Sequence, residues 1–266
     1  MGRQLVPDRL WELFLRVMPE APVRPQGGGR RRADDRGVLA AIPFVATSGC
    51  TWRQLPPMFG GRRGRPAHRR FTHWTEARVW AKLHRLVLDE LGARGELDWS
   101  RCAIDSVSLR AAKGGPLTGP NPTDRGKLGS KIHLITDRNG LPLSLGISGA
   151  NMHDSQGLEP LVRGIPPIRS PRGPRRRRPG KLHADKGYDY DHLRRWLRER
   201  GIRHRIARKG IESSQRLGRH RWVVERTVSW LAGCRRLHRR YERKSEHFLA
   251  FVGIAAALIC HRRLTN

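Results

Sequence analysis

Apolar residues recur at helical spacing through most of the first 95 residues. They stand three or four positions apart in three segments, which predicts amphipathic helices. These segments are residues 8–18, 34–48 and 69–92. Glycine, proline and arginine interrupt the pattern at 21–32 and 51–68, as is typical of loops. The pattern therefore predicts a mainly helical N-terminal domain, residues 1–95.

The pattern changes near Leu97, where apolar and polar residues begin to alternate and β-branched residues become frequent. Strands are predicted at 101–112, 130–140, 141–150, 181–187 and 202–210. Helices are predicted at 154–163, 189–200 and 219–241. An Asn-Gly pair at 139–140 predicts a hairpin between the second and third strands. This order predicts an α/β domain over residues 96–266, a mixed sheet flanked by helices as in the ribonuclease H-like fold.

The ends of the chain give little support for a membrane protein. The apolar run at 248–260 is shorter than the roughly 20 residues that a transmembrane helix needs, so we expect a buried C-terminal helix. The first residues, MGRQLVPDRLWELF, lack the long apolar core of a signal peptide. The four cysteines are scattered without a CxxC pair, which disfavours a structural zinc site. We therefore expect a protein of the reducing cytoplasm.

The charge of the chain narrows the choice of partner. Lysine and arginine number 54 against 23 acidic residues, a formal net charge of +31. A polyanion stabilises such a charge, because each neutralised phosphate releases counterions. Nucleic acid is therefore the expected partner, and an anionic membrane is the minor alternative. The basic loop 165–180 carries four consecutive arginines at 175–178; it either follows DNA phosphates or is a solvated loop.

Two aspartates stand in or at the end of predicted strands and are candidates for metal chemistry. Asp105 follows Cys-Ala-Ile, and a carboxylate in a central strand is costly to bury without a partner or a metal. Asp185 ends the strand KLHAD, at the strand end where α/β sheets usually build their sites. Local alternatives exist for both residues: Asp105 could cap a turn, and Asp185 could cap the helix predicted from residue 189.

Glu225 is a third candidate, within the predicted helical segment RHRWVVERTVSWL. By itself, an ion pair with Arg221, four residues earlier, would explain this glutamate. Phosphoryl transfer on DNA, however, needs converging carboxylates that hold two divalent cations beside the scissile phosphate. The three carboxylates together would meet that need.

Longer motifs surround all three carboxylates. AIDSVSLRAAKGG contains Asp105, ADKGYD contains Asp185 and RWVVERTVSWL contains Glu225. Three further segments accompany them: SGCTWRQLPPMFGGRRG, RRFTHWTEARVWAKL and KIHLITDRNGLPLSLGISGANMHDS. In this order, the motifs resemble those of bacterial insertion-sequence transposases of the DDE type, in the group named after insertion sequence five. The resemblance covers nearly the whole chain.

The resemblance implies a metal-dependent DNA strand-transfer enzyme of the bacterial cytoplasm, associated with the nucleoid. Asp105, Asp185 and Glu225 would form its acidic triad and bind two Mg²⁺ ions, for which Mn²⁺ could substitute. The substrate would be double-stranded DNA, at the terminal inverted repeats of the element and in the target. A dimer is expected on DNA, because two transposon ends must be brought together.

The resemblance also implies contacts to DNA. Arg221, one helical turn before Glu225, is expected to hold a phosphate, with a structural ion pair as the alternative. Recognition of the inverted repeats is expected from residues 1–95, through Arg62, Arg63 and Arg69, with Trp52, Arg53 and Arg65 beside them. In the catalytic domain the expected contacts are Lys186, Arg175, Arg176, Arg177, Arg178, Arg235 and Arg236.

Two further residues are expected to line the site, His153 and Tyr188. His153-Asp154 precedes a predicted helix, and a pair of this kind is frequent in the family. For Asp154 itself, the simpler interpretation is an N-cap of that helix.

The chain departs from the family pattern at two positions. Gly218 replaces a tyrosine three residues before Arg221, and Ala232 replaces a basic residue seven after Glu225. Arg235 and Arg236 are candidates to supply that cation. Three other interpretations stay open: a non-catalytic basic nucleic-acid-binding protein, another ribonuclease H-like nuclease, and a decayed transposase that binds DNA without cutting it.

Overall fold

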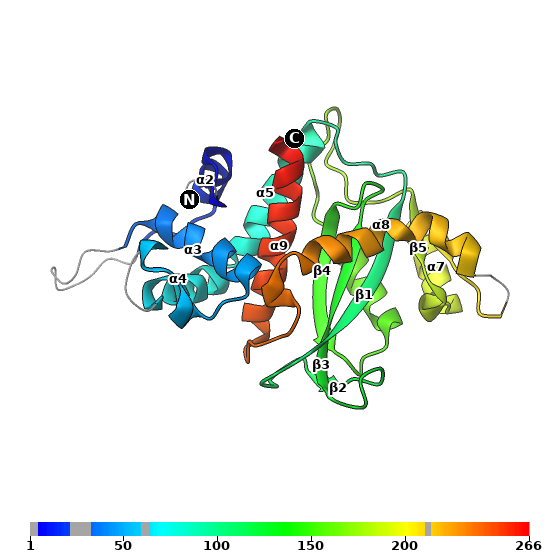
Figure 1. The fold of residues 1–266 in the computed structure, drawn as a ribbon. Coiled ribbons are helices and arrows are strands. Elements are labelled where there is room, and N and C mark those ends of the chain that lie inside the picture. The colour runs from blue at the N-terminus through cyan, green and yellow to red at the C-terminus, as the bar shows by residue number, and fades with distance from the viewer. Residues whose placement is uncertain (1–4, 22–32, 60–63, 211–213, 266) are drawn as a thin grey trace.

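The computed structural model describes residues 5–21, 33–59, 64–210 and 214–265, and side chains within the last range from residue 222 onward. Helices of the N-terminal part lie on one side of a mixed sheet (Figure 1). They are α2 (Asp8–Leu15), α3 (Asp35–Ser48), α4 (Arg65–Glu76) and α5 (Val79–Ala93), with short 3₁₀ turns η1 (Trp52–Gln54) and η2 (Pro57–Phe59). The prediction that this part is mainly helical is confirmed in the described residues. The boundary near residue 95 stays a prediction.

The long helix predicted at 69–92 is two helices. The chain turns at Arg78, which has φ +56° and precedes α5 as its N-cap. Glycine favours this left-handed conformation and arginine rarely adopts it, so the sequence offered no break signal. The loop predicted at 51–68 likewise contains η1 and η2, and α4 already begins at Arg65.

The sheet contains six strands in the described part of the chain. They are β1 (Cys102–Arg110), β2 (Gly119–Pro120), β3 (Leu128–Thr136), β4 (Pro142–Gly149), β5 (Lys181–Ala184) and β6 (Arg203–Ile206). Strands β4, β3 and β1 are antiparallel neighbours, and β5 and β6 continue beyond β1 as parallel strands. The two-residue β2 was not predicted. This order is that of the ribonuclease H-like fold, as the sequence predicted.

Helices cover both faces of the sheet. They are α6 (Leu158–Gly164) after the 3₁₀ turn η3 (Asp154–Gly157), α7 (Asp191–Glu199) after η4 (Lys186–Tyr188), α8 (Ser214–Ala232) and α9 (Ser245–Thr265). In Figure 1, α8 crosses in front of the strands. The helix predicted at 219–241 ends at Ala232 instead, and a 3₁₀ turn η5 (Arg235–Leu237) follows.

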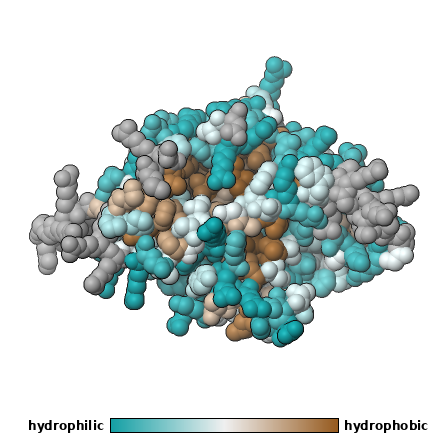
Figure 2. All heavy atoms as spheres, in the orientation of Figure 1, coloured by the Kyte–Doolittle hydropathy of each residue, from teal (hydrophilic) through white to brown (hydrophobic). Residues whose placement is uncertain are grey.

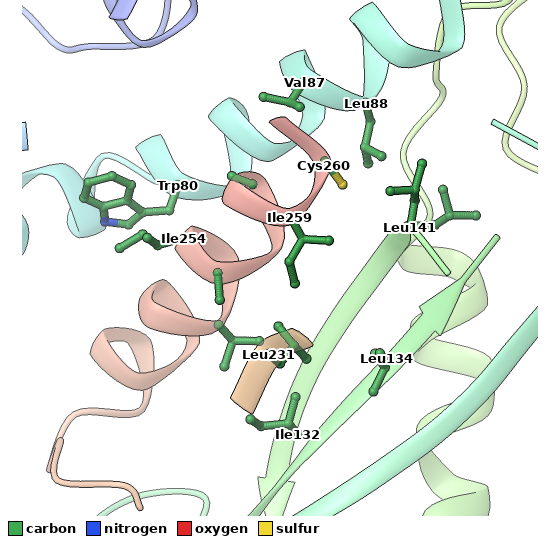
Figure 3. Packing of buried hydrophobic residues seen from close by; sticks show 14 of the residues in the cluster. Trp80, Val87, Leu88, Ile132, Leu134, Leu141, Leu231, Ile254, Ile259 and Cys260 are labelled. Carbon is green, nitrogen blue, oxygen red and sulfur yellow. The ribbon is translucent and has the colours of Figure 1, made fainter. Parts of the chain in front are cut away.

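The core lies between α5, α9 and one face of the sheet (Figure 3). Ile132 and Leu134 of β3 face Leu231 of α8 and Ile259 of α9, and all four are buried. The alternation of a strand puts Leu134 and its cross-strand partner Asp105 on the same face. Asp105 therefore points toward the layer of α8 and α9.

Helix α9 is longer than the run at 248–260 predicted. Among the described helices, α9 is the one whose length and composition would allow it to cross a membrane, with 21 residues that include an 18-residue stretch of mean hydropathy 1.5. Yet 72% of that stretch is buried within the molecule. Cys260 and Phe251 are fully buried. The predicted buried C-terminal helix is confirmed, although its length no longer argues against a membrane span.

Candidate active site

Asp105 and Asp185 come from neighbouring parallel strands. The register pairs Cys102 with Leu182 and Ala103 with His183. Continued by two residues, the same register brings Asp105 level with Asp185, which directly follows β5. Asp105 and Asp185 each lie two residues beyond the pair Ala103 and His183, so the register would put their side chains on the same face of the sheet.

The Asp185 carboxylate also has a local role. Its Oδ1 accepts a 2.8 Å hydrogen bond from the backbone N–H of Gly187, and it caps η4. The alternative role as a helix cap is thus realised for η4 and not for α7, whose N-cap is Tyr190. A Cβ at residue 187 would stand 3.0 Å from Asp185 Oδ1, so glycine there leaves room for the carboxylate. Capping uses one oxygen and is compatible with a second function.

Glu225 stands on an exposed flank of α8. The buried stripe of this helix contains Val224, Thr227 and Leu231. Arg226 donates to the carbonyl of Asn139 at 2.6 Å, so its flank of α8 faces the β3–β4 turn. At 100° per residue about the buried stripe, Glu225 lies on the opposite flank, toward the carboxyl ends of β1 and β5.

The three carboxylates are not gathered into one cluster. Within the described residues, no group of three or more His, Cys, Asp or Glu side chains lies close enough to hold a metal ion. The register of β1 and β5 brings the two aspartates level, while Glu225 approaches from the helical layer. The triad therefore stays a prediction.

A polar network lies on the opposite face of β1, directly behind Asp105. Ser106 Oγ donates to Asp154 Oδ1 at 2.7 Å, and Lys131 Nζ donates to the same oxygen at 2.8 Å. Burial raises the pKa of the Asp154 carboxyl, but the hydrogen bonds from Lys131 and Ser106 outweigh it and leave the pKa below its usual value. Ser106 also donates its backbone N–H to Asp105 Oδ1 at 2.8 Å. The network thus fixes both sides of the strand at Asp105.

This network corrects the interpretation of Asp154 as an N-cap. The cap of η3 is His153, whose Nδ1 accepts from the backbone N–H of Ser155 at 3.3 Å. Asp154 is drawn instead to Lys131, which is only 9% exposed and needs a counter-charge. A sequence-local rule could not find this pair, because its members are 23 residues apart.

Tyr188 and His153 occupy different surroundings. The Tyr188 ring is 1% exposed and belongs to the core, so it does not line an open site. Tyr190 does: its ring lies 5.7 Å from that of His153, and both line an open groove of about 760 Å³ with His192. No local pattern in the sequence distinguishes Tyr190 from Tyr188 as the residue that lines the groove.

The four arginines at 175–178 are exposed, and each of their side chains contacts another segment of the chain. Arg175 pairs with Asp89 at 2.8 Å, and the Arg176 guanidinium lies 5.7 Å from the Trp99 ring centre. Arg177 and Arg178 donate to the carbonyls of residues 163 and 200. The basic loop is therefore held against the domain with its charges outward.

Some of the remaining residues predicted to contact DNA are exposed, and one is buried. Lys186, Arg69 and Arg235 are exposed. Arg236 is not: it is 8% exposed and paired with Glu242 at 2.8 Å, which indicates a structural role in place of the expected DNA contact. Arg62 and Arg63 lie outside the described residues, and so does the side chain of Arg221.

Comparison of the sequence with known protein families shows which family the chain belongs to. Residues 99–260 match the family described as "Transposase DDE domain". The chain belongs to this DDE transposase family. Residues 6–84 match a second family, described as "Putative transposase of IS4/5 family". Asp105, Asp185 and Glu225 all fall within the matched DDE transposase domain.

This DDE transposase is similar to two proteins of Burkholderia cepacia. It is 49% identical over 151 residues to a Burkholderia cepacia protein named "Putative transposase for insertion sequence element IS402", covering 57% of this chain and 72% of that protein. A second B. cepacia protein, "Insertion element IS402 uncharacterized 16.2 kDa protein", is 37% identical over 46% of this chain and 84% of its own length. A pre-cleavage Mos1 transpososome structure is 10% identical over 96% of this chain and 86% of that chain, with a TM-score of 0.29, too low to define the fold.

Proposed function

We propose that this DDE transposase cleaves DNA at the terminal inverted repeats of its element and joins the cut ends to target DNA. Asp105, Asp185 and Glu225 would be its catalytic carboxylates. Family membership supports the reaction class. The observation that supports the choice of residues is the parallel register of β1 and β5, which would bring Asp105 and Asp185 side by side.

The donor set suits a hard divalent cation. Mg²⁺ prefers carboxylate and water oxygens, and Mn²⁺ accepts the same ligands. Asp105 and Asp185 would hold two such ions from the sheet, with Glu225 completing the set from α8. When bound, the ions would supply Lewis-acid stabilisation of the attacking and leaving oxygens at the scissile phosphate.

Hydrogen bonds and charges of the chain would position the carboxylates and the DNA. Gly187 holds one oxygen of Asp185, and the Ser106 backbone N–H holds one of Asp105, so neither carboxylate rotates freely. Exposed cations such as Lys186 would orient the phosphate backbone without reading its sequence. Catalysis would then rest on fixed geometry and electrostatics, as in other phosphoryl transfers.

The deciding experiment is strand cleavage of a duplex that carries the inverted repeats of the element. Wild type is compared with Asp185→Ala and with Asp191→Ala, an exposed aspartate in the first turn of α7. Each variant is assayed with Mg²⁺, Mn²⁺ and EDTA. We expect cleavage by wild type and Asp191→Ala that needs metal, and a loss of at least about a thousandfold in Asp185→Ala.

Two results would contradict the proposal. Equal cleavage by wild type and Asp185→Ala would remove this residue from the site. Tight DNA binding without cleavage under every metal condition would favour a non-catalytic binding protein or a decayed transposase. We also propose that the protein acts as a dimer that pairs two transposon ends and that it lies at the bacterial nucleoid. Sedimentation with one and with two DNA ends tests the dimer.

A further inference from the structure

A basic hollow opens where α8 meets α9, on the flank of α8 that faces the β3–β4 turn. Its volume is about 410 Å³. Arg226 and Trp230 of α8, Arg262 and Arg263 of α9, and Asn139 of the turn line it, together with two apolar residues. None of the residues that line it is acidic. It lies on the opposite flank of α8 from Glu225 and is not part of the carboxylate site.

Arg226 is held in a fixed orientation at the edge of this hollow. Its guanidinium lies 4.5 Å from the ring centre of Trp222 and 4.6 Å from that of Trp230. It also donates to the carbonyl of Asn139 at 2.6 Å. A cation held in this way loses little conformational entropy when it meets an anion.

The two tryptophans are exposed although they are large and apolar. Trp222 is 49% exposed and Trp230 is 37% exposed, one turn before and one turn after Arg226. In Figure 2, hydrophilic residues cover most of the visible face and hydrophobic atoms show mainly near its centre. Exposed aromatic residues beside arginine are typical of binding surfaces.

Charge decides what could bind there. Arg262 and Arg263 are exposed, and only Arg263 has a carboxylate partner, Glu96 at 3.2 Å, among the described residues. A second copy of the chain, presenting the same face, would place arginines against arginines. A phosphate backbone, in contrast, complements all three guanidinium groups.

We propose that the α8–α9 hollow binds the phosphodiester backbone of DNA, through Arg226 and Arg262 with Trp230 against the sugar. The inference rests on DNA being the substrate, as proposed above, and adds a contact outside the carboxylate site. Helix α8 would then lie between this contact and the carboxylates, so the hollow would hold duplex away from the scissile phosphate.

The test measures binding alone, so that it does not depend on cleavage. Full-length protein carrying Asp185→Ala is titrated in EDTA with a labelled duplex that bears an inverted repeat, from about 50 to 200 mM salt. Arg262→Gln should lower the slope of log affinity against log salt by about 1, and Arg262→Gln with Arg226→Gln by about 2. Circular dichroism checks that the variants stay folded.

The matched control is Arg195→Gln, which removes the same charge from an exposed site on α7, outside the contacts expected to bind DNA. Its slope should equal that of the parent. An equal fall in Arg195→Gln, or no fall in Arg262→Gln, overturns the assignment, and a change in sedimentation without a change in slope would indicate a protein partner instead. None of these outcomes bears on metal-dependent cleavage by the wild type, which is measured separately.

Discussion

The hydroxyl of Thr227 donates a 2.6 Å hydrogen bond to the carbonyl oxygen of Gly140, and this contact joins α8 to the β3–β4 turn. Thr227 is fully buried. Gly140 has φ +87°, and a Cβ there would stand 3.0 Å from Thr227 Oγ1. The pair therefore sets how closely α8 approaches the sheet, and Glu225 lies only two residues earlier on that helix.

Replacing Thr227 with valine keeps the shape of the side chain and removes this hydrogen bond. The carbonyl of Gly140 would lose a buried donor, so we expect a loss of about 1–2 kcal/mol in the free energy of unfolding. Urea denaturation measures it, with Ser229→Ala, at an exposed position of the same helix, as the control. Cleavage should fall in Thr227→Val more than stability alone explains; unchanged cleavage would show that Glu225 does not depend on this contact.

A second prediction concerns Asp154. Asp154→Asn would leave Lys131 buried without its counter-charge and weaken the hydrogen bond from Ser106. Because the Asp154 side chain is 36% exposed, water offsets part of the loss, and we expect on the order of 1–2 kcal/mol. The pKa of Asp154 is lowered in the folded protein, so its contribution is present above the unfolded pKa and is lost as pH falls through the folded pKa.

The measurement for Asp154 is denaturation of wild type and Asp154→Asn at neutral and at acidic pH. The difference between them should shrink as the pH falls toward 3. Glu159→Gln, whose carboxylate pairs at 3.2 Å with the exposed Arg163, is the control and should cost little. A difference that is constant with pH would show that the ion pair does not stabilise the fold.

Much of the fold was predictable because its signals are local. The strands around Asp105 and at 130–150 were recognisable from alternation and the Asn-Gly turn, and β1, β3 and β4 occupy those positions. The same pattern predicted Asp105 within a strand and Asp185 at the end of another; Asp105 lies in β1 and Asp185 directly follows β5. What the sequence could not show is the register itself, because it is set by pairing between strands about 80 residues apart.

Charged residues were the hardest to place. A count of arginines treats each one as surface charge, yet Arg240 is fully buried and donates to the carbonyls of Pro116, Leu117 and Glu242. Arg236 is buried beside Glu242 in the same way. Burial of such a cation depends on acceptors that the fold brings from distant segments, and no local pattern reports them.

A third prediction follows from His84, which is buried on α5. Its Nε2 lies 2.9 Å from the carbonyl of Pro142, and burial lowers its pKa to about 4, partly offset by that hydrogen bond. The unfolded chain binds a proton near pH 6.5 and the folded one does not, so stability is lost as pH falls from 6.5 toward 4. The loss due to His84 at pH 5 should be about 2 kcal/mol.

Denaturation at pH 7 and pH 5 tests this with His84→Gln. That variant is less stable at pH 7, but its stability should fall less between the two pH values. His192→Gln, at an exposed position, should keep the pH dependence of the wild type. Equal pH dependence in His84→Gln and wild type would show that His84 does not titrate abnormally.

The fourth prediction has the opposite sign and concerns Asp137, in the β3–β4 turn. Burial raises the pKa of its carboxyl to about 6, opposed by hydrogen bonds from the backbone N–H groups of Asp98, Leu141 and Asn139. The folded state therefore binds this proton more tightly than the unfolded state. The contribution of Asp137 is largest below pH 4 and is lost as pH rises through 6, which amounts to about 1 kcal/mol between pH 5 and pH 7.

Carbon-detected NMR of the side-chain carboxyl groups measures this directly, because the Asp137 signal should titrate near pH 6 while that of the exposed Asp191 serves as the reference. Asp137→Asn should remove this contribution, so the stability of the variant should fall more between pH 7 and pH 5 than that of the wild type. The amide would also turn a donor toward one of the three backbone N–H groups, so the variant should be less stable at every pH. A carboxyl that titrates near pH 4 would contradict the prediction, because it would mean that water reaches Asp137. Asp137 would then stabilise the β3–β4 turn only through its hydrogen bonds.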